Sequence, residues 1–168
     1  MKKTGIFYGS STGVTLDIAE IIGGKLGVDS DDIHDVSSAG ADAVAPYELL
    51  ILGSSTWGVG DLQGDWEDFL PKLKKADLSG KTVAIFGTGD ASSFSDTFCD
   101  AVGTIYSELQ NKGCRFCGAI SKDGYSFDAS TAEVDGQLVG LLIDEVNESN
   151  LTDDRMERWV EIIKESCA

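Results

Sequence analysis

Five short apolar runs alternate with segments of helical periodicity along this chain of 168 residues, and this alternation limits the fold more than any other feature. The apolar runs cover residues 3–8, 33–36, 48–53, 82–86 and 115–120. Helical spacing extends over residues 13–26, 62–75, 97–112 and 151–164. Strands that alternate with helices are typical of a parallel sheet with helices on both faces. The sequence therefore predicts an α/β, doubly wound fold that forms one domain over residues 1–168.

Residues 121–150 break this alternation. They combine turn signals at Lys122-Asp123-Gly124 and Asp135-Gly136 with apolar pieces at residues 125–127 and 138–143. Such a pattern predicts an insertion of about twenty residues that interrupts or extends the fifth strand.

Three polar loops follow predicted strands, and each is rich in Gly, Ser and Thr. We name them the first loop (residues 9–15), the second loop (residues 54–63) and the third loop (residues 87–97). In an open parallel sheet, ligands bind beyond the carboxyl ends of the strands. The second loop also carries Trp57, and the third carries Phe94. Two aromatic rings in polar loops at this edge predict a flat ligand held between them.

The first loop reads Ser-Ser-Thr-Gly-Val-Thr over Ser10–Thr15, without a lysine or arginine nearby. A Walker A loop would need a lysine after its second glycine. A dinucleotide motif that begins at Gly87 has Ser92 in place of its third glycine. Backbone N–H groups at a helix N-terminus, together with hydroxyl donors, can hold a single terminal phosphate. A hydroxyl cap without a ligand is the alternative, but six consecutive residues of this kind favour the phosphate.

These motifs resemble the flavodoxins over essentially the whole chain. Residues 10–15 match the family's phosphate loop [TS]-x-T-G-x-T, and residues 55–62 and 87–96 are similar to its inner and outer flavin loops. The stretch from Ser121 onward, including residues 140–145, resembles the insertion of the long-chain subgroup. The resemblance implies a five-stranded sheet of order 2-1-3-4-5 and non-covalently bound FMN. It also implies a low-potential one-electron carrier that uses the semiquinone/hydroquinone couple.

The resemblance assigns the FMN phosphate to the first loop and the flavin ring to the other two, with Trp57 on the inner face and Phe94 on the outer face. The implied FMN-binding residues are Ser10, Ser11, Thr12, Gly13, Val14, Thr15, Ser55, Thr56, Trp57, Gly58, Val59, Gly60, Thr88, Gly89, Asp90, Phe94, Thr97 and Cys99. Phe94 stands where most members have a tyrosine, so the ring area for stacking is kept and the hydroxyl is lost. Gly58 is expected to permit a peptide flip whose carbonyl accepts a hydrogen bond from the flavin N5–H of the neutral semiquinone.

The net charge of −16 comes from 13 Lys+Arg against 29 Asp+Glu. Nucleic acid and anionic membranes are therefore excluded as partners. A unit charge about 10 Å from the flavin opposes the anionic hydroquinone by roughly 0.4 kcal/mol, so ten charges cost about 4 kcal/mol, or roughly 170 mV, before salt screening. The acids expected near the flavin are Asp61, Asp65, Glu67, Asp68, Asp90, Asp96, Asp100, Asp144 and Glu145.

The acidic surface predicts docking to redox partners with basic surfaces, namely a donor resembling a flavodoxin or ferredoxin reductase and low-potential acceptor enzymes. The chain is expected to act as a monomer. No apolar run approaches the roughly 18 residues that span a bilayer. The N-terminus lacks the apolar region of a signal peptide, which predicts a cytoplasmic protein without a membrane partner.

The cysteines and the histidine add no catalytic or metal site. Cys114 and Cys117 have C-x-x-C spacing, but they fall in a predicted strand, where residues three apart point to opposite faces. We therefore expect ordinary thiols. His34 is the only histidine and is expected on the surface, while Trp66 and Trp159 are expected to pack in the core. With no Ser–His–Asp set and no second pair of metal ligands, the chain reads as an electron-transfer protein and not an enzyme.

Two alternative functions compete with this interpretation. An FMN-dependent quinone or nitro reductase would need room over the flavin and a nicotinamide site. Phe94 on the outer face, and loops without Arg or Lys, argue against it. A phospho-accepting receiver domain would need acidic residues after the first and third strands, where this chain has Gly9-Ser10-Ser11 and Gly53-Ser54-Ser55.

Overall fold

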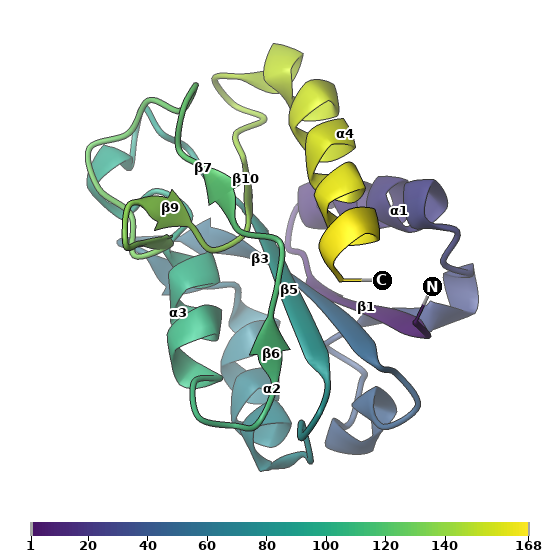
Figure 1. Cartoon of the computed structure of the whole chain (residues 1–168). Coiled ribbons are helices and arrows are strands. Elements are labelled where there is room, and N and C mark those ends of the chain that lie inside the picture. The colour runs from purple at the N-terminus through teal and green to yellow at the C-terminus, as the bar shows by residue number, and fades with distance from the viewer. Residues whose placement is uncertain (1, 168) are drawn as a thin grey trace.

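The computed structural model describes residues 2–167, and its centre is a parallel sheet between two layers of helices (Figure 1). The sheet has the strand order β10-β5-β3-β1-β2. Its strands are β1 (Thr4–Gly9), β2 (Ile33–Asp35), β3 (Leu49–Trp57), β5 (Thr82–Thr88) and β10 (Leu141–Ile143). With β10 in the fifth position, the predicted doubly wound sheet of order 2-1-3-4-5 is confirmed.

The fifth position of the sheet is shared by two short strands. β6 (Arg115–Phe116) pairs with the start of β5, and β10 pairs with its end. Between them the chain forms a small antiparallel sheet of order β7-β9-β8, from β7 (Ile120–Ser121), β8 (Glu133–Val134) and β9 (Gln137–Leu138). The prediction of a strand over residues 115–120 was therefore too long. The chain leaves the sheet at Gly118, whose φ of 85° is in the region that favours glycine.

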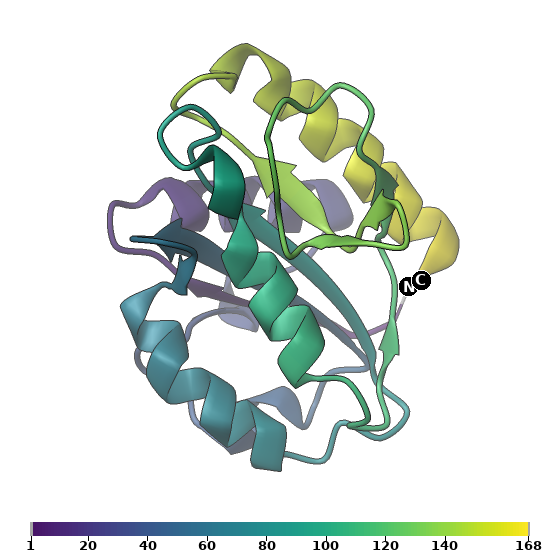
Figure 2. The same cartoon turned by 90° about the vertical axis from the view of Figure 1, so that its left-hand side faces the viewer.

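Two helices cover each face of the sheet. In Figure 2, α2 (Gly64–Lys75) and α3 (Asp100–Glu108) lie in front of the strands, and α1 (Val14–Leu26) and α4 (Ser149–Ser166) lie behind them. Consecutive residues of β3 are buried against opposite layers: Leu50 and Leu52 pack with α2 and α3, while Leu49 and Ile51 pack with α1 and α4. This two-sided burial explains why the strand is apolar throughout.

Short elements shift the predicted helix boundaries. The second loop folds back because β4 (Asp61–Leu62) pairs antiparallel with the end of β3, so α2 begins at Gly64. The 3₁₀ turn η3 (Ser95–Thr97) precedes α3, which begins at Asp100 and not at residue 97. Two further 3₁₀ turns, η1 (Ser30–Asp32) and η2 (Ala41–Val44), flank β2. Trp66 and Trp159 are fully buried, as predicted.

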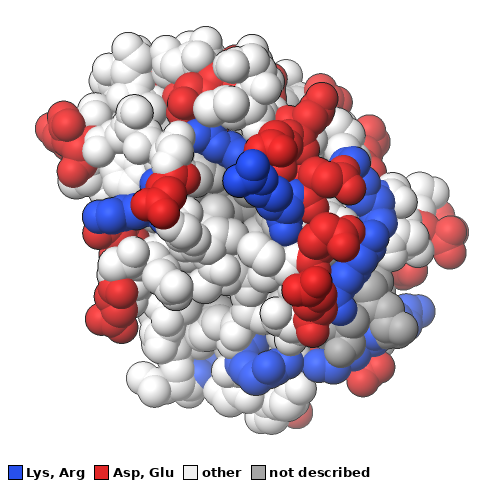
Figure 3. All heavy atoms as spheres, turned by 45° about the horizontal axis from the view of Figure 1, so that its top comes forward, with Lys and Arg blue, Asp and Glu red and all other residues white. Residues whose placement is uncertain are grey.

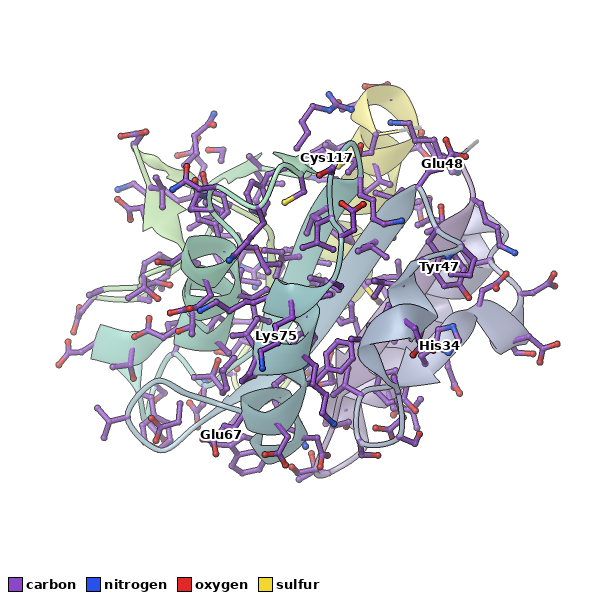
Figure 4. The ribbon with its side chains drawn as sticks, turned by 90° about the horizontal axis from the view of Figure 1, so that it is seen from below. His34, Tyr47, Glu48, Glu67, Lys75 and Cys117 are labelled. Carbon is purple, nitrogen blue, oxygen red and sulfur yellow. A yellow bond between two sulfur atoms is a disulfide. The ribbon has the colours of Figure 1, made fainter. Side chains whose placement is uncertain are left out.

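The cysteine prediction was wrong for Cys117. It forms a disulfide with Cys167, 50 residues further along the chain, with their Cα atoms 6.0 Å apart. Cys114 stays free and half-buried, packed against the other layer of the core. The two cysteines lie on opposite faces of the sheet, as expected. Cys117 lies beside the end of α4, which supplies its partner Cys167 (Figure 4).

His34 is half-buried and not on the surface as expected. Its Nε2 lies 2.7 Å from the hydroxyl of Tyr47, and its ring stacks on Phe7 at a centroid distance of 4.7 Å. The Tyr47 hydroxyl donates in turn to Asp32 Oδ1 at 2.7 Å. Figure 4 shows His34 and Tyr47 side by side. The contact joins β2 to the segment before β3, which explains how so short an edge strand is held.

Candidate functional site

The first, second and third loops meet at one edge of the sheet because β1, β3 and β5 are adjacent strands. Gly9, at the end of β1, lies opposite Ser54 of β3, and Ser54 lies opposite Gly87 of β5. Since the strands are parallel, the loops that follow them leave from the same edge. The structure thus brings together the three segments that the sequence identified separately.

The first loop ends at an open helix N-terminus. Gly13 is the N-cap residue of α1 with a φ of 94°, and no side chain caps the helix. Its own N–H donates to Ser10 Oγ at 3.0 Å, which closes the turn. Ser11 and Thr12 are exposed, while the hydroxyl of Thr15 lies 3.4 Å from that of Thr88. Uncapped N–H groups and the helix dipole make this end a binding place for an anion.

The second loop exposes the ring of Trp57, which a hydrogen bond and a hairpin hold in place. Trp57 closes the hairpin of β3 and β4, and its indole N–H donates to Ser55 Oγ at 2.8 Å. The ring is nevertheless 43% exposed. Gly58 and Gly60, at the hairpin tip, have φ values of 52° and 83°. The Thr56 hydroxyl accepts from the N–H of Ala101, which ties the hairpin to α3.

The third loop carries the second exposed ring. Phe94 is 46% exposed, although a phenylalanine in a folded domain is normally buried. The Asp90 carboxylate accepts hydrogen bonds from the N–H groups of Ser92 and Ser93, which shape the turn before Phe94. These bonds, first that from Ser93, and the side-chain bond from Asn147 lower the pKa of Asp90.

Thr97 and Cys99 differ from the other predicted site residues. Thr97 is half-buried in η3. Cys99 is fully buried with a φ of 51°, and burial raises the pKa of its thiol. A Cβ added at Gly89 would lie 3.0 Å from the Cys99 sulfur, so Cys99 packs underneath the third loop. The Cys99 side chain therefore packs against the buried side of the third loop.

Sequence reasoning missed two residues that hold the loops in place. Gln63 caps α2 by accepting from the N–H of Asp65, and its amide donates to Ser11 Oγ at 3.2 Å. Asn147 donates through its side chain both to Asp90 at 2.8 Å and to Asp144 at 2.9 Å. The Asp-x-x-Asn spacing directly after an apolar strand is a signal for an Asx turn that could have found Asn147, but no local signal points to its partner Asp90, 57 residues away.

Asp144 joins the third loop to the segment before α4. The sequence placed it only among the acids near the flavin, yet its exposure is 0%. One oxygen accepts from the N–H of Ala91 at 3.1 Å, and the other accepts from the N–H groups of Val146 and Asn147. A buried carboxylate is tolerated only when its oxygens are satisfied in this way.

Charge is distributed unevenly around the site. No lysine or arginine lies in the three loops, and several basic residues lie instead near strand starts or helix ends: Lys2, Lys3, Lys25, Lys72, Lys74, Lys75, Lys81, Lys112, Arg115 and Lys164. On the face in Figure 3, basic side chains lie beside acidic ones. The ion pairs of the described residues include Lys25–Glu157 and Arg158–Asp154. Because the three loops contain no lysine or arginine, the edge of the sheet that carries them has an excess of negative charge.

Two kinds of feature are not found in residues 2–167. None of the helices described there has both the length and the apolar composition needed to cross a membrane. The same residues contain no cluster of three or more His, Cys, Asp or Glu side chains arranged to hold a metal ion.

Comparison with known proteins gives consistent results. The model of the family described as flavodoxin matches residues 6–159. A flavodoxin of Nostoc sp. is 45% identical over 163 residues, covering 97% of this chain and 96% of that protein. Flavodoxin 1 of Azotobacter vinelandii is 41% identical over 169 residues, covering 98% and 97%. A crystal structure of Fusobacterium nucleatum flavodoxin bound to flavin mononucleotide has a TM-score of 0.90 and 33% identity, covering 98% of each chain.

Proposed function

Because this chain belongs to the flavodoxin family, we propose that it binds FMN without a covalent bond and works as a low-potential one-electron carrier, not as an enzyme. The observation that carries the proposal is the meeting of an uncapped helix N-terminus with two exposed aromatic rings on adjacent loops. Bound FMN supplies the one-electron chemistry. The residues of the chain hold the cofactor and set its surroundings.

The phosphate of FMN is assigned to residues 10–15. Ser11 and Thr12 are exposed, and no side chain caps the N-terminus of α1. Together they offer neutral donors and the positive end of a helix dipole. A phosphate bound there keeps its negative charge, because no cationic side chain lies in the loop.

The flavin ring is assigned to the space between the second and third loops. Trp57 would cover its inner face and Phe94 its outer face, with the backbone of Thr88, Gly89 and Asp90 at the pyrimidine edge. Both rings are nearly half exposed, as expected of side chains that stack on a ligand. Gly58 at the hairpin tip is exposed and has a φ of 52°, which suits the proposed peptide flip.

The acidic surroundings are proposed to keep the potential of the second one-electron step low. Asp90 and Asp144 lie at the third loop, and Asp61 lies at the hairpin tip. Negative charge near the cofactor opposes the addition of an electron. Replacing three or four of the acids expected near the flavin by amides should raise the potential of that step by tens of millivolts, and an unchanged potential would contradict this role.

We further propose that this single domain acts as a monomer in the cytoplasm and docks to basic surfaces of donor and acceptor proteins. The excess of acids at the loop edge would orient such partners toward the cofactor. Reductase-like donors and low-potential acceptor enzymes are the expected partner classes.

A visible spectrum of the purified protein tests the cofactor assignment. Oxidised-flavin bands, or their appearance after FMN is added to FMN-free protein, are expected. A colourless protein that does not bind added FMN would overturn the proposal. Fast turnover of a quinone with NAD(P)H would instead favour a reductase.

A further inference from the structure

Gln63 is a buried polar side chain at the place where the first and second loops meet. It lies between β4 and α2, and it is only 2% exposed. Its backbone N–H donates to Ser54 Oγ at 3.3 Å, which holds the Gln63 backbone beside β3. A Cβ added at Gly9 would collide with Gln63 Oε1, so the side chain crosses the end of β1 in close contact. Gln63 therefore has little room to move.

The amide of Gln63 has one orientation that satisfies its neighbours. Its Oε1 accepts from the backbone N–H of Asp65 at 3.0 Å, and its Nε2 donates to Asp65 Oδ2 at 2.8 Å. Because an N–H only donates and a carboxylate only accepts, a flipped amide would lose both of these bonds. The second amide proton is then directed to Ser11 Oγ, 3.2 Å from Nε2.

This donation decides what the Ser11 hydroxyl can do. A serine hydroxyl has one proton and two lone pairs. Since Gln63 supplies a proton to Ser11 Oγ, the hydroxyl's own proton must point elsewhere. Within residues 2–167 that proton has no hydrogen-bond acceptor, and Ser11 is exposed. The hydroxyl is thereby kept as a donor for an acceptor outside the chain.

We propose that Gln63 is a positioning residue for the FMN phosphate and acts through the Ser11 hydroxyl. The proposal rests on the proposed function, which places the phosphate at residues 10–15. A free hydroxyl samples three staggered rotamers, so holding it as a donor removes an ordering cost that phosphate binding would otherwise carry. The first loop has no cationic side chain, so its affinity for phosphate depends on donors that are oriented before binding.

Gln63→Met tests this role, because methionine has a similar length but no N–H. FMN and riboflavin, which lacks the phosphate, are titrated separately into the FMN-free protein, and quenching of flavin fluorescence gives both dissociation constants. FMN binding should weaken about three- to tenfold, whereas riboflavin binding should change less than about twofold. Gln110→Met is the matched control, since this exposed amide donates to the Tyr106 carbonyl, and it should change neither constant.

Two outcomes of this titration would overturn the proposal. Equal weakening of FMN and riboflavin would show that Gln63 merely supports the second loop. Unchanged FMN binding would show that the Ser11 hydroxyl does not depend on the amide.

A double-mutant cycle with Ser11→Ala tests whether the effect passes through the hydroxyl. Once the hydroxyl is removed, the amide has nothing left to orient. Adding Gln63→Met to Ser11→Ala should therefore change FMN binding less than about twofold. The same fold-change with and without the Ser11 hydroxyl would overturn the proposed action through Ser11.

Gln63→Glu keeps the proposal testable if the methionine variant does not fold, because a carboxylate oxygen can still cap α2 by accepting from the N–H of Asp65. The new carboxylate cannot donate, so the Ser11 hydroxyl should donate to it and turn away from the phosphate. FMN binding should weaken about tenfold or more. In the Ser11→Ala background only the charge repulsion remains, so the loss should be clearly smaller, and an equal loss would overturn the proposal.

The unmodified protein separates the two levels of the proposal. If it binds no FMN, the proposed function fails, and the role of Gln63 fails with it. If it binds FMN more tightly than riboflavin and the Gln63 variants keep the same ratio of the two dissociation constants, only the positioning role fails.

Discussion

Replacing Asp144 by alanine should destabilise the edge of the sheet that carries the proposed FMN site. Its carboxylate is completely buried and accepts from three backbone N–H groups and the side-chain amide of Asn147. It links the third loop, at Ala91, directly to the segment before α4, beside the bond from Asn147 to Asp90. Alanine removes every one of these acceptors and adds none.

The expected loss is about 3 kcal/mol in the free energy of unfolding. A hydrogen bond to a charged group contributes about 1.5–3 kcal/mol, so four such bonds would sum to more than about 6 kcal/mol. Val146 and Asn147 are exposed, and water can replace part of what their N–H groups lose. Ala91 is half-buried and carries more of the loss. Asp144→Asn keeps one acceptor oxygen and should lose about half as much.

Urea unfolding with FMN at a fixed excess, followed by far-UV circular dichroism, measures this loss. Fluorescence quenching of FMN should show weaker binding in the same variant, because the third loop is released. Glu145→Ala is the control, since this neighbour is exposed and should change stability by less than about 0.5 kcal/mol. A loss below about 1 kcal/mol in Asp144→Ala would refute the view that this carboxylate holds the two segments together.

Three further perturbations test other parts of the structure. Gly58→Ala should cost about 1 kcal/mol at a φ of 52°, and its new Cβ would lie 2.8 Å from an Asp61 oxygen. Because this hinders the proposed flip, redox titration should show the two one-electron potentials closer together. Unchanged potentials would contradict the flip. Burial, followed by the hydrogen bond to Asp32, raises the pKa of Tyr47 to about 12, so the folded state holds the phenol proton more tightly than the unfolded state. Stability from this group is complete below about pH 10 and should fall by up to about 2 kcal/mol between about pH 10 and 12. Burial also raises the pKa of Tyr125 to about 12, so Tyr47→Phe should remove only part of the fall seen in pH-dependent unfolding. The Cys117–Cys167 disulfide closes a loop of 50 residues, so its reduction should lower the free energy of unfolding by up to about 4 kcal/mol. Urea unfolding with and without reductant measures this loss. Coincident curves would contradict it, provided that mass spectrometry has verified the disulfide in the oxidised sample.

The Cys117–Cys167 disulfide is unexpected for a protein in the proposed cytoplasmic compartment. Stable disulfides are uncommon in proteins of a reducing cytoplasm. Alkylation of the protein directly on cell lysis, followed by mass measurement, shows whether Cys117 and Cys167 are joined where the protein works.

Local patterns were enough to predict the elements and the candidate loops. Apolar runs and helical spacing over residues 3–26 and 48–86 indicated β1, α1, β3, α2 and β5, because burial of one face imposes a period that a short window of sequence reveals. The loop at Ser10–Thr15 could be interpreted from its own residues, since glycine and hydroxyl residues at a helix start have a local backbone role. Alternation of strands and helices then predicted the parallel sheet.

The tertiary structure decided everything that depends on contacts between distant residues. Asp144 reaches Ala91 across 53 positions, and Cys117 joins Cys167 across 50. His34 gained its partner Tyr47 only when β2 lay beside β1. Periodicity and turn chemistry are properties of neighbouring residues, whereas burial, pairing and charge compensation depend on which surfaces the packed sheet brings together.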